Sequence, residues 1–170
     1  MTTLVVLRGN SGSGKSTVAH EVQRRFERGA LLVVPQDIVR RRMLREEDKP
    51  DGSNVDLIAH IATFGLERGL IVLVEGILRA SRYGPMLQRL SAVADHTLCY
   101  AYDLSFEETT RRHTTRPQSA EFGTAEMRSW YRGWDPLDFV DEVRFDATWT
   151  SAAAIDRLHS DIVAWSASSR

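Results

Sequence analysis

The chain has 170 residues, 42% of them hydrophobic and 26% charged, which is typical of a folded globular protein and excludes a disordered or fibrous one. Its formal net charge of −1 provides no overall positive field for nucleic acid or anionic membrane. The one cysteine, Cys99, excludes an internal disulfide, and no apolar run reaches the roughly 20 residues that span a bilayer, so we expect a cytoplasmic protein.

Apolar runs and helical periodicity alternate along the chain. In chain order they predict a strand at residues 4–7, a helix at 16–28, a strand at 31–34, helices at 37–45 and 55–67, strands at 70–74 and 97–102, helices at 105–113 and 124–132, a weaker strand at 142–147 and a helix at 151–165. The first three strands are continuously apolar, which is typical of parallel strands covered on both faces. The pattern therefore predicts one α/β domain over residues 1–170 with right-handed crossovers.

A phosphate-binding motif follows the first predicted strand directly. Residues 9–16 read Gly-Asn-Ser-Gly-Ser-Gly-Lys-Ser, the G-x-x-x-x-G-K-S pattern of a P-loop, between a strand and a helix as the motif requires. We predict that ATP is bound by Gly9, Asn10, Ser11, Gly12, Ser13, Gly14, Lys15, Ser16 and Thr17. Lys15 would reach the β- and γ-phosphates and Ser16 would ligate Mg²⁺. The alternative is a turn without a ligand, but this arginine-rich chain has only two lysines and places one of them here.

Two carboxylates follow predicted strands at the sheet edge where ligands bind in parallel sheets. Asp37 follows the second strand, where it is a candidate general base, although it could also cap the next helix. Glu75 follows the third strand and is a candidate for the metal or for the acceptor, with a surface turn as the alternative. Gly76 beside it favours a close approach of the backbone to a ligand. Asp103 follows the fourth strand, but we expect it only to stabilise the turn before Ser105.

Arginines on or just after the fourth predicted helix, residues 105–113, are candidates for contact with phosphate groups. One of Arg111 and Arg112 is expected to face the nucleotide, and Arg112 is placed among the nucleotide-binding candidates. Arg116 precedes a proline and an irregular stretch, which favours a mobile lid over about residues 112–123 that carries Arg116 onto the phosphates. Arg40, three residues after Asp37, shares its helix face and could orient it or meet the charge of an acceptor.

Three aromatic residues, Trp130, Tyr131 and Trp134, follow the predicted lid. They are expected to pack in the core, and an aromatic wall for the acceptor stays as the alternative.

These segments resemble those of the small P-loop kinases of the adenylate-kinase-like group. The resemblance covers nearly the whole chain and rests on residues 9–16, 36–40, 74–76 and 102–116. Within the group the chain is similar to zeta-toxin and chloramphenicol-phosphotransferase-like kinases, to the 5′-kinase domain of phage-type polynucleotide kinase, and to proteins called uridine-kinase-like. The resemblance implies a P-loop NTPase three-layer sandwich with a five-stranded parallel sheet of order 2-3-1-4-5 and a lid.

The same resemblance implies roles for individual residues. Asp37 matches the general base, Arg40 an arginine on the acceptor side, and Arg116 a lid arginine that clamps phosphates. Glu75 departs from the family, where an aspartate is more common, which leaves open whether it serves the metal or the acceptor.

The expected activity is ATP- and Mg²⁺-dependent phosphorylation of a hydroxyl on a small molecule such as a nucleoside, a sugar or an antibiotic. The expected catalytic residues are Lys15, Asp37 and Arg116, and the expected acceptor contacts are Asp37, Arg40, Glu75 and Arg79. A polynucleotide 5′-hydroxyl kinase is the alternative, which the near-neutral charge disfavours. A nucleotide-dependent switch is less favoured, because the chain has no N-K-x-D motif. We expect a monomer or homodimer without a membrane partner.

Overall fold

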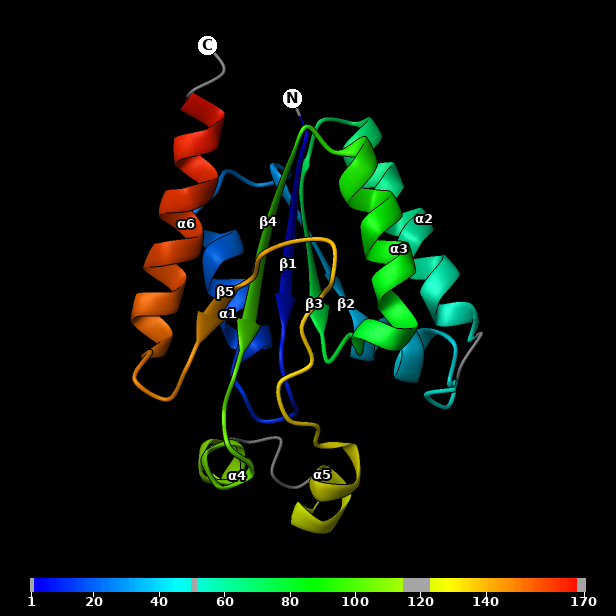
Figure 1. Cartoon of the computed structure of the whole chain (residues 1–170). Coiled ribbons are helices and arrows are strands. Elements are labelled where there is room, and N and C mark those ends of the chain that lie inside the picture. The colour runs from blue at the N-terminus through cyan, green and yellow to red at the C-terminus, as the bar shows by residue number, and fades with distance from the viewer. Residues whose placement is uncertain (1, 50–51, 115–122, 168–170) are drawn as a thin grey trace.

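Five parallel strands form the centre of the computed structural model, which describes residues 2–49, 52–114 and 123–167. The strands are β1 (Thr3–Arg8), β2 (Leu31–Pro35), β3 (Ile71–Gly76), β4 (His96–Tyr102) and β5 (Val143–Phe145). Their order is β2-β3-β1-β4-β5 and every neighbouring pair is parallel, which confirms the expected sheet. The carboxyl ends of β1 and β4 point toward the lower end of the molecule in Figure 1.

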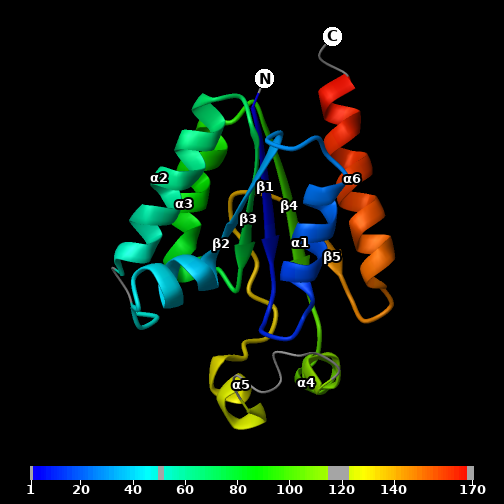
Figure 2. The same cartoon turned by 180° about the vertical axis from the view of Figure 1, so that it is seen from behind.

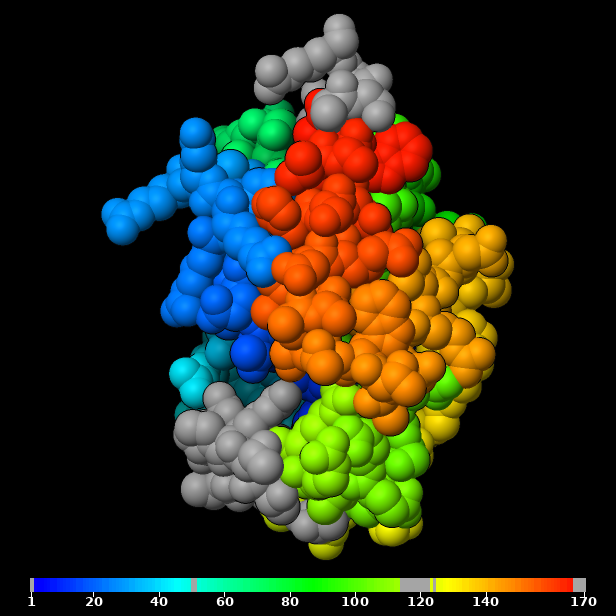
Figure 3. All heavy atoms as spheres, turned by 90° about the vertical axis from the view of Figure 1, so that its left-hand side faces the viewer, coloured from blue at the N-terminus to red at the C-terminus, as the bar shows by residue number. Residues whose placement is uncertain are grey.

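Helices cover both faces of this sheet (Figures 1 and 2). One face carries α1 (Lys15–Arg24) and α6 (Ser151–Ala167), and the other carries α2 (Ser53–Glu67) and α3 (Ala80–Val93). Figure 3 looks onto the outer side of α6, with α1 beside it. The molecule is therefore the expected three-layer sandwich.

The central strand β1 explains why the predicted strands are continuously apolar. Leu4 and Val6 belong to the hydrophobic cluster under α2 and α3. Val5 and Leu7, the alternate residues, belong to the cluster under α1 and α6. All four side chains are fully buried, because successive residues of a strand point to opposite faces and both faces are covered here.

Two helical segments differ from the expectations. Helix α3 was not predicted, because Gly84 and Pro85 interrupt its apolar pattern and normally disfavour a helix interior. Packing of buried residues such as Tyr83 and Leu87 against the sheet offsets that preference. Residues 38–43, expected within an α-helix, form the six-residue π-helix η1 (Ile38–Met43), and the N–H of Leu44 donates to the carbonyl of Val39 five residues back (3.1 Å).

Two short helices, α4 (Phe106–Thr114) and α5 (Thr124–Trp130), lie beyond the carboxyl end of the sheet (Figure 1). The predicted lid over residues 112–123 falls between them. Its central part, residues 115–122 with Arg116, lies outside the described residues. None of the helices within the described segments combines the length and the low polarity needed to cross a bilayer.

A buried ion pair joins the last residue of β1 to the chain before β5. The guanidinium of Arg8 donates to both carboxylate oxygens of Glu142, at 3.0 and 2.9 Å, and these two side chains are only 4% and 1% exposed. Arg8 also donates to the carbonyls of Leu78 (3.1 Å) and Asp135 (2.6 Å). Glu142 in turn accepts the N–H of Leu137 (2.8 Å). Arg8 therefore holds three separate segments directly beside the P-loop.

Replacing Glu142 with Gln tests this ion pair. The Glu142→Gln variant removes the buried anionic partner of the guanidinium and leaves only the longer ion pair with the partly exposed Asp135 (3.4 Å), so we expect its free energy of unfolding to fall by roughly 3 kcal/mol. The control is Glu21→Gln, which removes an exposed ion pair with Arg24 and is expected to change stability by less than about 0.5 kcal/mol. Urea unfolding of both variants measures the difference, and equal stabilities would contradict the role given to Arg8.

Candidate active site

The P-loop joins the buried strand β1 to α1, and its backbone is held at both ends of the turn. The N–H of Gly9 donates to the carbonyl of Gly76 in β3 (3.2 Å), and the N–H of Ser13 donates to the carbonyl of Asn10 (3.2 Å). Gly12 has a φ of 82°, and a Cβ atom there would lie 2.5 Å from the carbonyl oxygen of Thr109. Glycine is therefore needed at this position both for the turn and for the close approach of α4.

Two polar side chains of the P-loop are buried where phosphate groups would bind. Lys15 begins α1, and its Nζ donates to the carbonyl of Asn10 (3.2 Å). The hydroxyl of Ser13 is buried and has no hydrogen-bond partner among the described residues. A buried hydroxyl without a partner is unfavourable, so the loop has hydrogen-bonding capacity for a ligand. This unused capacity fits the binding of a nucleoside triphosphate.

The two candidate metal ligands lie in direct contact. The hydroxyl of Ser16 donates to Oε1 of Glu75 at 2.9 Å. Glu75 lies within β3 rather than after it, is only 4% exposed, and pairs in register with Leu7 of β1 and Pro35 of β2. Burial raises the pKa of its carboxyl, while the charge of Lys15 and the hydrogen bond from Ser16 lower it. A hydroxyl and a buried carboxylate form an oxygen donor set that fits Mg²⁺.

Asp37 lies close enough to Glu75 for its charge to raise the pKa of the Glu75 carboxyl further. Unlike Glu75 its side chain is 56% exposed, and it makes no capping hydrogen bond with the following helix. Its Oδ1 instead lies 3.3 Å from Arg40 and 3.5 Å from Arg41. The carboxylate of Asp37 is thus oriented by two arginines and remains accessible to a second substrate.

A cavity of about 320 Å³ lies beside the segment that contains Asp37, although Asp37 itself is not one of its lining residues. It is lined by Gln36, Arg40, Arg41, Glu47, Asp48, Ile77, Arg79 and Trp130. We name it the acceptor cavity. It brings together Arg40 and Arg79, two of the predicted acceptor residues.

Behind the acceptor cavity, a buried hydrogen-bond network fixes Gln36. Its amide nitrogen donates to the hydroxyl of Tyr83 (2.7 Å), which donates to Oδ1 of Asn54 (2.7 Å). Its amide oxygen accepts the N–H of Ile77 (3.1 Å). A Cβ at Gly76 would lie 2.5 Å from this oxygen, so the backbone at Gly76 approaches Gln36 closely.

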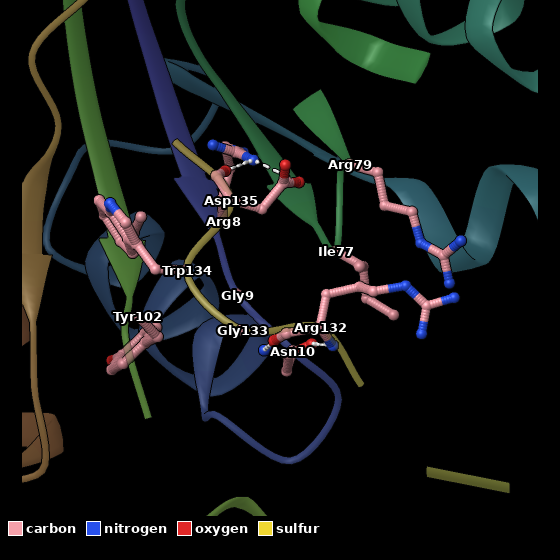
Figure 4. Close-up of a pocket in the computed structure, with 11 residues that line it drawn as sticks. Arg8, Gly9, Asn10, Ile77, Arg79, Tyr102, Arg132, Gly133, Trp134 and Asp135 are labelled. Atoms are coloured by element: carbon pink, nitrogen blue, oxygen red, sulfur yellow. Dashed lines mark hydrogen bonds and ion pairs between the residues drawn. The ribbon is translucent and has the colours of Figure 1, made fainter. Parts of the chain in front are cut away.

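A second, small cavity lies between the P-loop and the segment after α5 (Figure 4). The side chain of Asn10 donates to the carbonyl of Arg132 (2.7 Å) and accepts its N–H (3.0 Å), which ties this segment to the P-loop. Trp134 stands on one side of the cavity in Figure 4 and Arg79 on the other. Arg79 therefore lines both this cavity and the acceptor cavity.

Of the two adjacent arginines in α4, Arg112 faces the P-loop. It donates to the carbonyls of Ser13 (3.3 Å) and Trp149 (3.4 Å). Both arginines line a cavity of about 470 Å³ together with Thr17. The Arg111 side chain is 71% exposed. Both arginines bind Glu108, and their hydrogen bonds lower the pKa of that carboxyl to about 2.

The aromatic residues after the lid were expected to be core residues, but their positions differ. Trp130 and Trp134 line cavities, and the guanidinium groups of Arg41 and Arg144 lie 4.9 and 4.3 Å from their ring centroids. Tyr131 packs edge-on against Phe106. The expectation of core packing is therefore wrong for the two tryptophans, and an aromatic wall for the acceptor stays a prediction.

Asp103 makes an ion pair with Arg144 of β5. Its partner is therefore in the neighbouring strand and not in the turn before Ser105, where we expected it.

Sequence reasoning missed Arg8, Gln36 and Arg132. A charged residue at the end of the apolar run 4–7 was a usable signal for Arg8. Gln36 and Arg132 carried no such signal, because their importance comes from contacts with distant segments.

A family model for an AAA domain, AAA_33, matches residues 4–126, which is most of the chain. A comparison with curated proteins gives no match.

Several solved structures share the fold. The APS kinase CysC of Mycobacterium tuberculosis, in complex with AMPPNP and APS, is 23% identical over 95% of each chain, with a TM-score of 0.65. A gluconokinase from Sinorhizobium meliloti 1021 is 18% identical over 96% of this chain and 97% of that one, with a TM-score of 0.64. A chain of the Pnkp1/Rnl/Hen1 RNA repair complex is 20% identical, with 75% of this chain and 42% of that chain covered and a TM-score of 0.58.

The raised pKa of Glu75 predicts a pH-dependent effect of Glu75→Gln on the nucleotide-free protein. A raised pKa in the folded state means that wild-type stability is lost as pH rises from the ordinary value of 4.5 through the folded pKa. We therefore expect Glu75→Gln to be more stable than wild type at pH 8 and the difference to shrink toward pH 4. Urea unfolding between pH 4 and pH 8 measures the stability difference, with the exposed Glu67→Gln as control. A difference that does not change with pH would contradict the raised pKa of Glu75.

The two arginines of α4 provide a matched pair of variants. Arg112→Gln removes donors to the P-loop and to Trp149, so we expect the KM for ATP to rise about tenfold. Arg111→Gln changes an exposed side chain and should leave the KM within about twofold. Initial rates at varied ATP concentration measure both, and the reverse ranking would show that Arg111 is the nucleotide-facing residue.

Proposed function

Since the chain belongs to the AAA domain family AAA_33, we propose that it is an ATP-dependent kinase that transfers the γ-phosphoryl group to a hydroxyl of a small molecule. The observation that carries the proposal is the arrangement at the carboxyl edge of the sheet. Ser16 of the P-loop donates a hydrogen bond to buried Glu75. The charges of Lys15 and of the accessible Asp37 both act on the carboxyl of Glu75, so these side chains lie near it. A phosphate site, a metal site and a proton acceptor are thus adjacent, which phosphoryl transfer requires.

On the nucleotide side, the P-loop N–H groups and Lys15 bind the phosphates of ATP, and the unpartnered hydroxyl of Ser13 supplies a further contact. Arg112 lies beside the loop, where it can contact the nucleotide. Ser16 and Glu75 hold Mg²⁺ directly or through water. When bound, the metal ion neutralises charge that develops on the phosphate oxygens.

On the acceptor side, Asp37 accepts the proton of the attacking hydroxyl. The hydroxyl oxygen forms a bond to the γ-phosphorus while the bond from that phosphorus to the bridging oxygen breaks and ADP leaves. Arg40 and Arg41 keep the carboxylate of Asp37 oriented for this step. Arg116 would add charge stabilisation from the lid.

A small acceptor fits the charges better than a polynucleotide does. The net charge is −1, and Arg40 and Arg41, which begin the basic run after Asp37, already bind the carboxylate of Asp37. Affinity for nucleic acid depends on cations that neutralise backbone phosphates.

The test is ATP consumption with a panel of nucleosides, sugars, sugar acids, aminocyclitol antibiotics and 5′-hydroxyl oligonucleotides. We expect one small-molecule class to stimulate ADP release and to yield a phosphorylated product by mass spectrometry. Lys15→Met should abolish transfer and weaken AMPPNP binding, because Lys15 is the cation of the phosphate site. A Lys15→Met protein that binds AMPPNP as tightly as wild type would contradict the proposed site.

With the acceptor in hand, Asp37→Asn separates chemistry from binding. We expect kcat to fall by about 10²–10⁴-fold while AMPPNP affinity is retained, because the amide cannot take the proton. The control is Asp56→Asn on the exposed side of α2, which should keep wild-type kcat.

A further inference from the structure

Among the residues that the structure describes, the guanidinium of Arg79 has no partner. Its Nε is buried, and within residues 2–49, 52–114 and 123–167 its side chain makes no hydrogen bond or ion pair. Burial of an unsatisfied donor is unfavourable, and more so for a charged group. Such a cation between two cavities indicates a site for a ligand that is negatively charged.

The backbone around Arg79 is held rigidly from several directions. The N–H of Ile77 donates to Gln36 (3.1 Å), the carbonyl of Leu78 accepts from buried Arg8 (3.1 Å), and the N–H of Ala80 donates to Asp135 (2.9 Å). Leu78 has a φ of 45°, which is rare for a residue other than glycine. Strained backbone held by several contacts is typical of functional positions, so the placement of Arg79 is preorganised.

The acidic residues near the acceptor cavity already have partners. Glu47 pairs with Lys49 (2.7 Å), and Asp48 makes an ion pair with Arg82. Asp37 binds Arg40 and Arg41. None of these carboxylates pairs with Arg79 in the segments that the structure describes, so the positive charge of Arg79 remains available to a ligand.

Two more arginines add to the positive charge around this position. The Nε of Arg40 is also buried without a partner, and Arg40 lines the acceptor cavity with Arg79. Arg132 lines the smaller cavity with Arg79, and its guanidinium donates to the carbonyls of Ser129 and Tyr131. In Figure 4 the guanidinium groups of Arg79 and Arg132 both lie on the side of the cavity away from Trp134.

We propose that Arg79, together with Arg40, binds an oxyanion of the acceptor, so that the substrate is a small hydroxyl compound that also carries a phosphate monoester or a carboxylate. Arginine suits this task because its planar guanidinium donates two parallel hydrogen bonds to such a group. The inference rests on the proposed kinase function and specifies its substrate class. It places the anion beside Gln36 and Trp130, which line the cavity with Arg79. The acceptor hydroxyl must then reach Asp37, whose carboxylate is bound to Arg40.

The experiment first saturates the protein with AMPPNP and Mg²⁺, so that the P-loop cannot bind the added anion. The arginine Nε–Hε signals are then followed by NMR during titration with sulfate, inorganic phosphate or acetate at constant ionic strength. The variants are Arg79→Gln and, as matched control, Arg89→Gln on the exposed side of the same helix α3. The tetrahedral and planar anions distinguish a phosphate monoester from a carboxylate as the preferred group.

We expect a saturable shift of the Nε–Hε signals of Arg79 and Arg40 with at least one anion. When the titration is followed at the Arg40 signal, the affinity for that anion should be about tenfold lower in Arg79→Gln than in wild type. The affinity should be unchanged in Arg89→Gln. In activity assays, pairs of acceptors that differ only in carrying or lacking the anionic group are compared, and the anionic acceptor should be the better substrate. Arg79→Gln should raise the KM for the anionic acceptor while changing kcat little.

Different outcomes overturn different conclusions. If AMPPNP does not bind, the proposed kinase function fails, and the substrate class fails with it. If AMPPNP binds but no anion gives a saturable shift, or Arg79→Gln keeps wild-type anion affinity, only the anionic acceptor is overturned. An Arg79→Gln variant that weakens AMPPNP and leaves anion binding unchanged would place Arg79 on the nucleotide and also overturn it.

Discussion

The buried ion pair between Arg8 and Glu142 is the constraint on which the geometry of the site depends. Arg8 is the last residue of the central strand, so whatever it holds is held relative to the P-loop that begins at Gly9. It fixes the turn after β3 through Leu78 and the segment after α5 through Asp135. Two charges out of water are stabilised only when both are paired and hydrogen-bonded, as they are here. The small cavity is formed by segments that Arg8 holds, and one of them, the turn after β3, also lines the acceptor cavity.

A second network, centred on neutral side chains, does the same for the acceptor side. Gln36 connects the exit of β2 to the exit of β3 and, through Tyr83 and Asn54, to helices α3 and α2. Buried polar groups with every partner in place are rigid, because any shift leaves one of them unsatisfied. Asp37, the next residue after Gln36, is thereby fixed at its backbone while its carboxylate remains accessible. The proposed site thus combines rigid support with exposed reactive groups.

The residues of the candidate site were predictable where their role follows from a continuous motif or from their position along a strand. Lys15 and Ser16 come from a continuous motif, and Asp37 and Glu75 from their positions at the exits of apolar strands, which meet at one edge of a parallel sheet. The contact between Ser16 and Glu75 and the choice of Arg112 over Arg111 depend on how α4 and β3 approach the P-loop. No spacing in the sequence specifies those approaches.

The sequence by itself determined the layered α/β fold, because strands covered on both faces must be apolar throughout and the P-loop pattern must stand between a strand and a helix. It did not reveal helix α3, whose Gly84 and Pro85 oppose a helix locally and are overruled by burial against the sheet. Only the tertiary structure decided that Arg79 has no partner in the described part of the chain while Arg8 has several. The physical reason is that pairing of charges depends on distances between segments far apart in the chain, whereas strands and motifs depend on neighbours in sequence.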